Sequence, residues 1–337
     1  MLRQCRPRRV RDLWTFAEQE IVLPDGPMKD LRFTVETQPY TALWFLAHAE
    51  ATGSVRDGKD GKDLKDLKDL KDLKDLKDGR DGRDEESALR ADCSGLNIFI
   101  NVGPTQSGKT LSTLVIPVLW HLFEHEETVC CLVPDEDMVN DKWREDFKPV
   151  IEKSRYAKYL PRTGEGSRNG KVSDAVRFGN GVTLKFLTGG GGDKSVAAFT
   201  SRVLAATEIN AFGKLSEASA EGNRWTQALG RLRAYGDRAV VYGECTVDTE
   251  SGLVWTEYTN GTGSRVAMPC GYCGEYVTLE RKHLVGWESA ASVVQAKAMA
   301  RWCCPECGVI WEVGDREKFA RGSVLVHRGQ EVVRGEG

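Results

Sequence analysis

One octapeptide limits the possible folds of this chain more than any other feature. Residues 103–110 read GPTQSGKT and fit the pattern G-x-x-x-x-G-K-S/T in full. Glycines in such a loop let backbone N–H groups close around phosphate oxygens, while Lys109 reaches the β- and γ-phosphates and the Thr110 hydroxyl binds Mg²⁺. The predicted nucleotide ligands are Gly103, Pro104, Thr105, Gln106, Ser107, Gly108, Lys109 and Thr110.

The sequence on both sides of this loop has the character that phosphate binding requires. Residues 96–102 are apolar and β-branched, which predicts a buried strand. Apolar residues then recur at helical spacing, at Leu111, Leu114, Val115, Val118, Leu119 and Leu122. A strand, a glycine-rich turn and a helix would place phosphates at the helix N-terminus, and Pro117 predicts a kink in that helix. The alternative is a glycine-rich surface turn that binds nothing.

The pattern after the loop predicts an α/β fold class. Apolar strands are expected at 128–133, 182–187, 202–206 and 239–243, and a helix at 138–151. A further amphipathic helix is expected at 39–48. Alternating strands and helices predict a mostly parallel sheet flanked by helices, as in a P-loop NTPase.

Composition excludes several classes of protein. A net charge of -3 over 337 residues argues against nucleic-acid binding by overall charge, so any such contact would be local. No apolar run has the length of a membrane span, and the basic residues 1–10 lack the apolar core of a signal peptide. We expect a cytoplasmic protein without a membrane partner.

Residues 58–86 form a low-complexity Lys-Asp-Leu repeat. A period of three matches neither a helix nor a strand, and the balanced charges leave few apolar groups for a core. We predict a disordered insert ahead of the phosphate-loop strand. A charged arm that follows DNA is the alternative, but acidic residues match the basic ones along its length.

Two segments compete to supply the acidic half of an ATP site. Residues 133–137 (VPDED) carry carboxylates, but Pro and Asp together are also ordinary turn residues, so we expect a structural or DNA-facing loop there and keep catalysis as the alternative. The strand at 203–206 ends in Thr207-Glu208, where Asp-Glu is the usual pattern. Glu208 is expected to orient the hydrolytic water. Thr207 supplies no negative charge, which predicts weaker Mg²⁺ binding and impaired hydrolysis. A plain strand end with a solvated Glu208 is the alternative.

The strand at 239–245 has a polar end, Thr246-Val-Asp-Thr, that is suited to sensing the γ-phosphate. Arg231 and Arg233 precede it and are candidate arginine fingers, acting on the nucleotide of a neighbouring subunit. Exposed helix arginines are the alternative.

Cysteine spacing predicts a structural metal site. Half of the 10 cysteines lie between 270 and 307, around two C-x-x-C-G motifs. Cys270, Cys273, Cys304 and Cys307 would hold Zn²⁺ tetrahedrally in a zinc-ribbon-like module, stretched by a helix expected at 287–301. Cys303 adjoins the second pair, but the spacing favours Cys304. Independent free cysteines are the alternative.

In this order the motifs resemble the lambda-type large subunit of phage terminase. Smaller matches include Pro39-Tyr40, Val133-Pro134 with Met138 and Trp143, and residues 221–223 leading into Arg231. The resemblance implies an ATP-driven motor that packages double-stranded DNA into a capsid. It places the family's nucleotide motif on 103–110, its acidic strand end on Thr207-Glu208, its coupling motif on Thr246 and its cysteine motifs on the four cysteines.

The resemblance also implies partners and a domain layout. The partners would be double-stranded DNA, the terminase small subunit, the portal or procapsid, and further copies of the chain, with ATP, Mg²⁺ and Zn²⁺ as cofactors. The expected segments are a helical 1–57, the insert 58–86, an ATPase core 87–262, the cysteine module 263–315 and a tail 316–337 without the family's nuclease domain. Alternatives are a degenerate prophage remnant that binds zinc without hydrolysis, and a helicase-like DNA-dependent ATPase.

Overall fold

The computed structural model describes residues 10–37, 39–52, 96–189, 201–214, 223–330 and 332. The chain forms two compact units. The first contains the described residues of Met1–Phe33 and His48–Glu257, and the second contains those of Thr34–Ala47 and Tyr258–Gly337. The predicted Lys-Asp-Leu insert lies outside the described residues, as do residues 221 and 222 of the segment that leads into Arg231.

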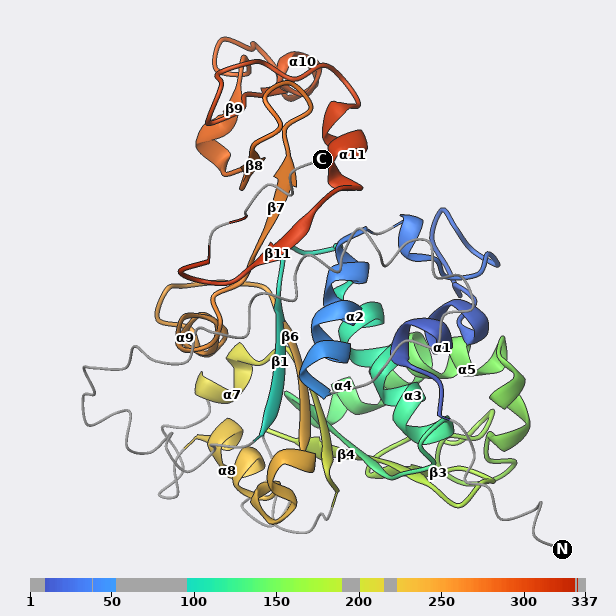
Figure 1. The fold of residues 1–337 in the computed structure, drawn as a ribbon. Helices are drawn as coiled ribbons and strands as arrows, with labels where there is room; N and C mark the ends of the chain where they lie inside the picture. Colours follow the sequence, from blue (N-terminus) through green and yellow to red (C-terminus); the bar gives the residue numbers. More distant parts are fainter. Residues whose placement is uncertain are drawn as a thin grey trace, which may run out of the picture. The chain divides into compact units, whose positions relative to one another are not determined.

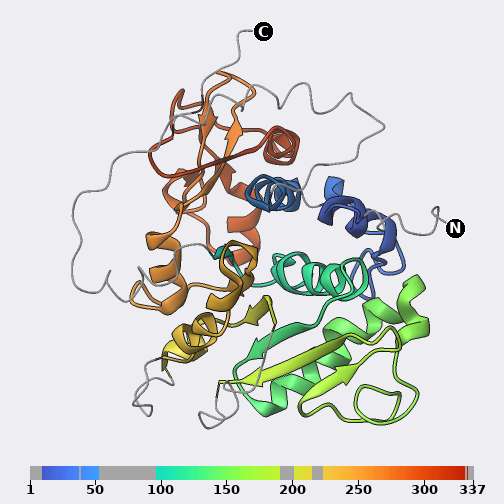
Figure 2. The same ribbon diagram turned by 60° about the horizontal axis from the view of Figure 1, so that its bottom comes forward.

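The first unit is built on a six-stranded, mostly parallel sheet (Figure 1). Its strand order is β1-β6-β5-β2-β4-β3. The bounds are β1 Asn97–Val102, β2 Val129–Val133, β3 Ala175–Arg177, β4 Thr183–Thr188, β5 Val203–Thr207 and β6 Val240–Cys245. All neighbours pair in parallel except β3 and β4, which pair antiparallel at one edge (Figure 2). The predicted α/β class and mostly parallel sheet are confirmed.

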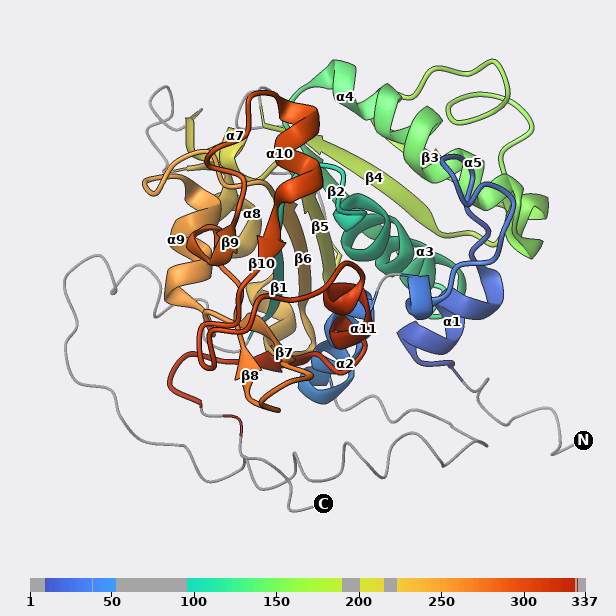
Figure 3. The same cartoon turned by 90° about the horizontal axis from the view of Figure 1, so that it is seen from above.

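Helices cover both faces of this sheet (Figure 3). One face packs on α7 Asn210–Lys214, α8 Arg224–Gly230 and the start of α9 Leu253–Asn260, with the short helical turn η10 Arg233–Arg238 between α8 and β6. The other face carries α1 Leu13–Glu20, α3 Ile116–Phe123, α4 Glu136–Asp141, α5 Lys148–Glu152 and the short turn η8 Arg155–Tyr159. Strands β2, β5 and β6 are buried at every residue, which explains their continuous apolar character. β1, predicted as a buried strand, lies at the edge of the sheet and is only partly buried.

The helix after the phosphate loop changes its hydrogen-bonding pattern before Pro117. Its first part, η6 Thr110–Val115, is π-helical, and α3 begins at Ile116. Pro117 occupies the first turn of α3, where its missing N–H is tolerated. The kink predicted at Pro117 stays a prediction, and the structure shows a change from π-helical to α-helical hydrogen bonding one residue before it. A second π-helical segment, η7 Lys142–Phe147, joins α4 to α5 within the helix predicted at 138–151.

The acidic segment after β2 has a structural role. Asp135 is the N-cap of α4, and its Oδ1 accepts a hydrogen bond of 2.9 Å from the Met138 amide. This bond satisfies one of the free N–H groups at the start of the helix. β2 is separated from β1 by β5 and β6, so Asp135 follows a strand that does not adjoin the loop strand.

The second unit contains the cysteine motifs. It holds α2 Pro39–Thr52 up to Ala47 together with η2 Val35–Thr37, then β7 Arg265–Pro269, β8 Tyr276–Val277, η11 Arg281–His283, β9 Leu284–Val285, α10 Val293–Met299, β10 Arg301–Trp302, α11 Asp315–Ala320 and β11 Val324–Val326. Strand β11 pairs antiparallel with β7, so the module continues past the predicted boundary at residue 315. Helix α10 is shorter than the predicted 287–301, because Ser292 caps its N-terminus.

Among the described residues, no helix combines the length and the apolar character needed to cross a bilayer.

Candidate functional site

The phosphate loop leaves β1 and turns directly into the helix. Gln106 and Gly108 have positive φ angles of 58° and 78°, so the backbone curls within the loop. The Ser107 hydroxyl closes the curl by donating to the Pro104 carbonyl at 2.8 Å. A Cβ on Gly103 would lie 3.3 Å from Ser107 Oγ and 3.4 Å from Lys109 Cδ, so glycine gives the loop its room. Such a concave backbone is suited to an anion.

Lys109 is directed to the end of the neighbouring strand. It is 7% exposed, and its Nζ donates to Thr246 Oγ1 at 3.0 Å and to the Pro104 carbonyl at 3.4 Å. The same ammonium lies 3.7 Å from Glu244 Oε2. Parallel pairing of β1 with β6 sets Val102 opposite Cys245, which brings the loop beside Thr246. The structure therefore brings together two predicted site residues, Lys109 and Thr246.

Thr207 and Glu208 end β5, the strand on the other side of β6. Thr207 is fully buried, and its hydroxyl donates to Glu244 Oε1 at 2.5 Å. Glu208 is exposed and has a positive φ of 54°, a conformation that costs a non-glycine residue energy. Its Oε2 accepts a hydrogen bond of 3.6 Å from Cys245 Sγ. Thr207 and Glu208, at the end of β5, therefore contact Glu244 and Cys245 at the end of β6.

Glu244 is a candidate site residue that the sequence did not point to. It lies on β6 opposite Thr207, is 1% exposed, and contacts residues from both neighbouring strand ends. Its Oε1 lies 3.5 Å from the Thr110 hydroxyl, which donates to it. A glutamate within an otherwise apolar strand was the available signal, because glutamate is rarely fully buried without a partner.

The turn after β6 is connected to the helix after β5. Asn210 Nδ2 donates to the Thr246 carbonyl at 3.4 Å and to Asp248 Oδ1 at 2.5 Å. Asn210 Oδ1 accepts from the Val254 amide at 2.8 Å. Burial raises the pKa of the Cys245 thiol to about 11, so this group stays neutral near neutral pH. These bonds give the polar end of β6 a defined position.

The structure does not bring Arg231 to the loop of its own chain. Arg231 and Arg233 are exposed and lie between α8 and β6. They precede the N-terminal end of β6, whereas the loop lies at the edge formed by the C-terminal ends of β1 and β6.

The four predicted zinc ligands lie together in the second unit. The Sγ atoms of Cys270, Cys273, Cys304 and Cys307 are all within 4.8 Å of one another. Gly274 and Gly308 have positive φ angles of 76° and 71°, and each donates its N–H to the first cysteine of its own pair. Cys303 instead directs its thiol to the Gly308 carbonyl at 3.4 Å. This geometry suits a tetrahedral thiolate site.

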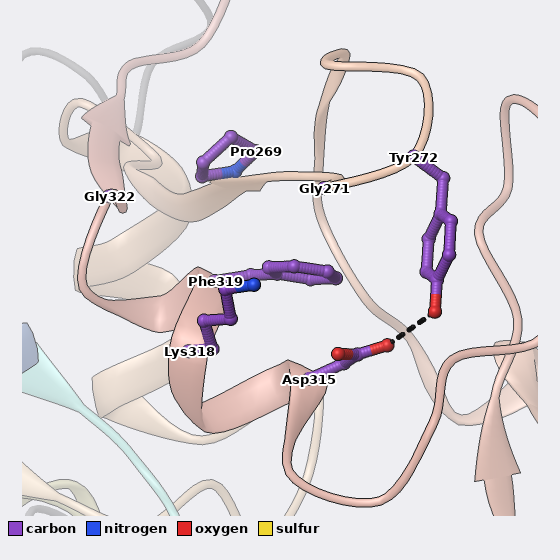
Figure 4. A pocket seen from close by; sticks show the side chains of 7 residues that line it. All are labelled: Pro269, Gly271, Tyr272, Asp315, Lys318, Phe319 and Gly322. Carbon is purple, nitrogen blue, oxygen red and sulfur yellow. Dashed lines mark hydrogen bonds between the residues drawn. The ribbon is translucent and has the colours of Figure 1, made fainter.

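A hollow beside the first cysteine turn is lined by Pro269, Gly271, Tyr272, Asp315, Lys318, Phe319 and Gly322 (Figure 4). The Tyr272 hydroxyl donates to Asp315 Oδ2 at 2.8 Å. A Cβ on Gly271 would lie 2.2 Å from Phe319 Cε1, so glycine is needed for the ring to pack there. The lining contains no residue of the phosphate loop.

Comparison with protein families gives one informative match. The family model described as phage terminase large subunit gpA, ATPase domain, matches residues 92–324. The match includes the phosphate loop, the ends of β5 and β6, and all four clustered cysteines. Comparison with curated proteins gave no match. Since the family model covers more than half of the chain, the resemblance noted from the motifs is confirmed, and the protein belongs to the family of the phage terminase large subunit gpA ATPase domain.

Proposed function

We propose that this chain is the ATPase motor portion of a DNA-packaging terminase, which couples ATP hydrolysis to translocation of double-stranded DNA into a capsid. One observation carries the proposal. Lys109 is held by Thr246 at the strand end beside the loop, within 3.7 Å of a buried carboxylate. A buried lysine next to a curled glycine loop at a helix N-terminus is an arrangement that binds a polyphosphate.

The residues divide the hydrolytic work as follows. The loop N–H groups bind the phosphates, and Lys109 moves from Thr246 to the β- and γ-phosphates. Glu208 orients a water and takes up its proton as the water oxygen attacks the γ-phosphorus and the bond to the bridging oxygen breaks, which yields ADP and inorganic phosphate. Thr110 would hold Mg²⁺, whose charge neutralises the phosphate oxygens when it is bound.

The first test is ATP turnover by the full chain in the presence of Mg²⁺ and DNA. Lys109→Ala is expected to remove turnover and to weaken nucleotide binding, because the loop loses its only side-chain ammonium. Glu208→Gln is expected to remove turnover while nucleotide binding persists. Turnover that is unchanged by Lys109→Ala would rule out catalysis at this loop.

Communication between subunits is a second part of the proposal. Arg231 would act on the nucleotide of a neighbouring copy, since it lies away from the loop of its own chain. Mixtures of Arg231→Ala chains with Lys109→Ala chains would then recover turnover, because some interfaces combine an intact loop with an intact arginine. Recovery of no turnover in such mixtures, with both variants folded, would exclude this role.

We also propose that the four cysteines hold Zn²⁺ in a closed, structural site. The supporting observation is the mutual distance of their Sγ atoms, all within 4.8 Å. The module's apolar cluster is small and includes Cys270, Cys304, Trp311 and Phe319, so metal ligation would add to the stability of a small core.

Translocation of DNA would further require the small subunit and the portal. Packaging of duplex DNA into procapsids is the assay that distinguishes a packaging motor from a helicase, which separates the strands.

A further inference from the structure

The carboxylate of Glu244 lies among the residues expected to bind Mg²⁺ and nucleotide. Its Oε1 accepts from the Thr207 hydroxyl at 2.5 Å and from the Thr110 hydroxyl at 3.5 Å. Its Oε2 lies 3.7 Å from Lys109 Nζ. Glu244 therefore contacts the loop, the first residue of the following helix and the end of β5.

The second oxygen of this carboxylate has no hydrogen-bond partner. Glu244 Oε2 is buried and makes no hydrogen bond in the described part of the chain. Glu244 as a whole is 1% exposed, so bulk solvent has little access to this oxygen. A buried carboxylate with one unsatisfied oxygen is costly, and such a group needs an explanation. A cation that binds closer to this oxygen than Lys109 Nζ, which lies 3.7 Å away, would satisfy it.

The strand register explains why the charge comes from β6. Thr207 pairs with Glu244 across β5 and β6, and paired residues on neighbouring strands point to the same face of a sheet. The negative charge that is missing at Thr207 is therefore present one strand away, on the same face and at the same level.

We propose that Glu244 supplies the carboxylate of the Mg²⁺ site, in place of an acidic residue at position 207. This inference rests on the proposed nucleotide site. Thr110 and Glu244 would act together toward the metal, with Thr207 holding the carboxylate in position. ATP hydrolysis then does not require an acidic residue at position 207. Thr207 by itself predicts weaker Mg²⁺ binding and impaired hydrolysis, and a carboxylate from Glu244 would remove that effect.

A purely structural role predicts a different behaviour. If Glu244 served only as a counter-ion for Lys109, the carboxylate would lose its partner when Lys109 moved to the phosphates. A metal ion that arrives with the nucleotide would replace the lysine charge at that moment. Dependence on Mg²⁺ therefore separates the two roles.

The test measures nucleotide binding and metal binding directly. Binding of a fluorescent ATP analogue to the full chain is titrated with Mg²⁺ and with EDTA, and Mn²⁺ binding in the presence of nucleotide is followed by electron paramagnetic resonance. Glu244→Gln keeps the shape and an acceptor for Thr207 but removes the charge. We expect the Mg²⁺-dependent gain in affinity to fall by about tenfold or more, with binding in EDTA unchanged or stronger. Glu250→Gln is the matched control, with a wild-type response to Mg²⁺, because Glu250 is an exposed carboxylate that follows the turn after β6.

A charge-relocation variant keeps the inference testable if Glu244→Gln fails to fold. In Thr207→Asp combined with Glu244→Gln, the carboxylate returns to β5, and we expect Mg²⁺ dependence to return. The inference is overturned if the folded double variant binds nucleotide with an affinity that does not depend on Mg²⁺. It is also overturned if a folded Glu244→Gln variant shows the wild-type dependence of nucleotide affinity on Mg²⁺. A wild-type chain that binds no nucleotide with Mg²⁺ overturns the proposed function itself.

Discussion

The ammonium of Lys109 donates a hydrogen bond of 3.0 Å to the hydroxyl of Thr246. Lys109 follows β1 and Thr246 follows β6, so this bond joins the phosphate loop to the polar end of the neighbouring strand. The Thr246 carbonyl in turn accepts from Asn210, which lies on the helix after β5. A movement of Lys109 toward a phosphate would therefore be transmitted to both strand ends.

Removal of the Thr246 hydroxyl should impair hydrolysis more than binding. In Thr246→Val, Lys109 loses its 3.0 Å partner, while the main-chain carbonyl that accepts from Asn210 is kept. We expect steady-state ATP turnover to fall about tenfold, equivalent to ~1.4 kcal/mol of activation free energy. Thr249→Val is the control, because Thr249 is exposed and lies in the same turn. Equal losses in the two variants would argue against a specific role for Thr246.

Acid should destabilise the first unit through buried histidines. Tyr242 Oη lies 2.8 Å from His48 Nε2 and 2.9 Å from His121 Nε2. Burial lowers the pKa of His48 from 6.5 to about 3 and also lowers the pKa of His121. Below pH 6.5 the histidines of the unfolded chain bind protons, whereas the buried histidines of the folded chain stay neutral. Their contribution to the free energy of unfolding is therefore fully present above pH 6.5 and is lost as the pH falls toward 3.

Urea unfolding at a series of pH values measures this loss. Each histidine that stays neutral in the folded state contributes about 1.4 kcal/mol per pH unit to the slope of the free energy of unfolding. His48→Gln should reduce that slope between pH 6.5 and about pH 3. The carboxylate of Glu127, which contacts both His121 and Arg202, also has a lowered pKa and adds to the loss at lower pH. A slope unchanged by His48→Gln would contradict the assignment.

Two adjacent cysteines should respond differently to the same substitution. Cys304 belongs to the four-thiol cluster, whereas Cys303 directs its thiol to a backbone carbonyl. Cys304→Ser is expected to abolish stoichiometric zinc and to destabilise the second unit, because three thiolates leave the site incomplete. Cys303→Ser should retain one zinc per chain. Atomic absorption of the purified proteins decides between these outcomes, and equal zinc content in both variants would refute the ligand assignment.

A methyl group at Gly271 should disturb the same module without touching a cysteine. A Cβ there would lie 2.2 Å from Phe319 Cε1, which forces the ring out of its position. We expect Gly271→Ala to cost about 1–3 kcal/mol of unfolding free energy. Gly230→Ala is the control, because a methyl group at Gly230 would meet no heavy atom within 4 Å beyond its own helical turn. Thermal unfolding of the two variants tests the difference.

Short stretches of sequence were enough to predict the strand, the loop and the helix around the phosphate loop. The strand before the loop, the loop and the apolar helix after it lie next to one another in sequence, so their pattern predicts their structure directly. The same holds for the two C-x-x-C-G turns, because each thiol pair and its glycine form one short backbone turn. The limits of local reasoning appear at 287–301, where the capping by Ser292 shortens the predicted helix.

The sequence by itself determined the segments that form β1, β2, β4, β5 and β6, the position of the phosphate loop and the spacing of the two cysteine pairs, but it did not predict β3 or the short strands of the second unit. Only the tertiary structure decided that β6 lies between β1 and β5, and hence that Glu244 lies against both Thr207 and Thr110. The reason is physical. Hydrophobic periodicity is a property of neighbouring residues, whereas the order of parallel strands depends on packing between segments that are distant along the chain, so a charge that stands one strand away from its expected place is visible only after the sheet has formed.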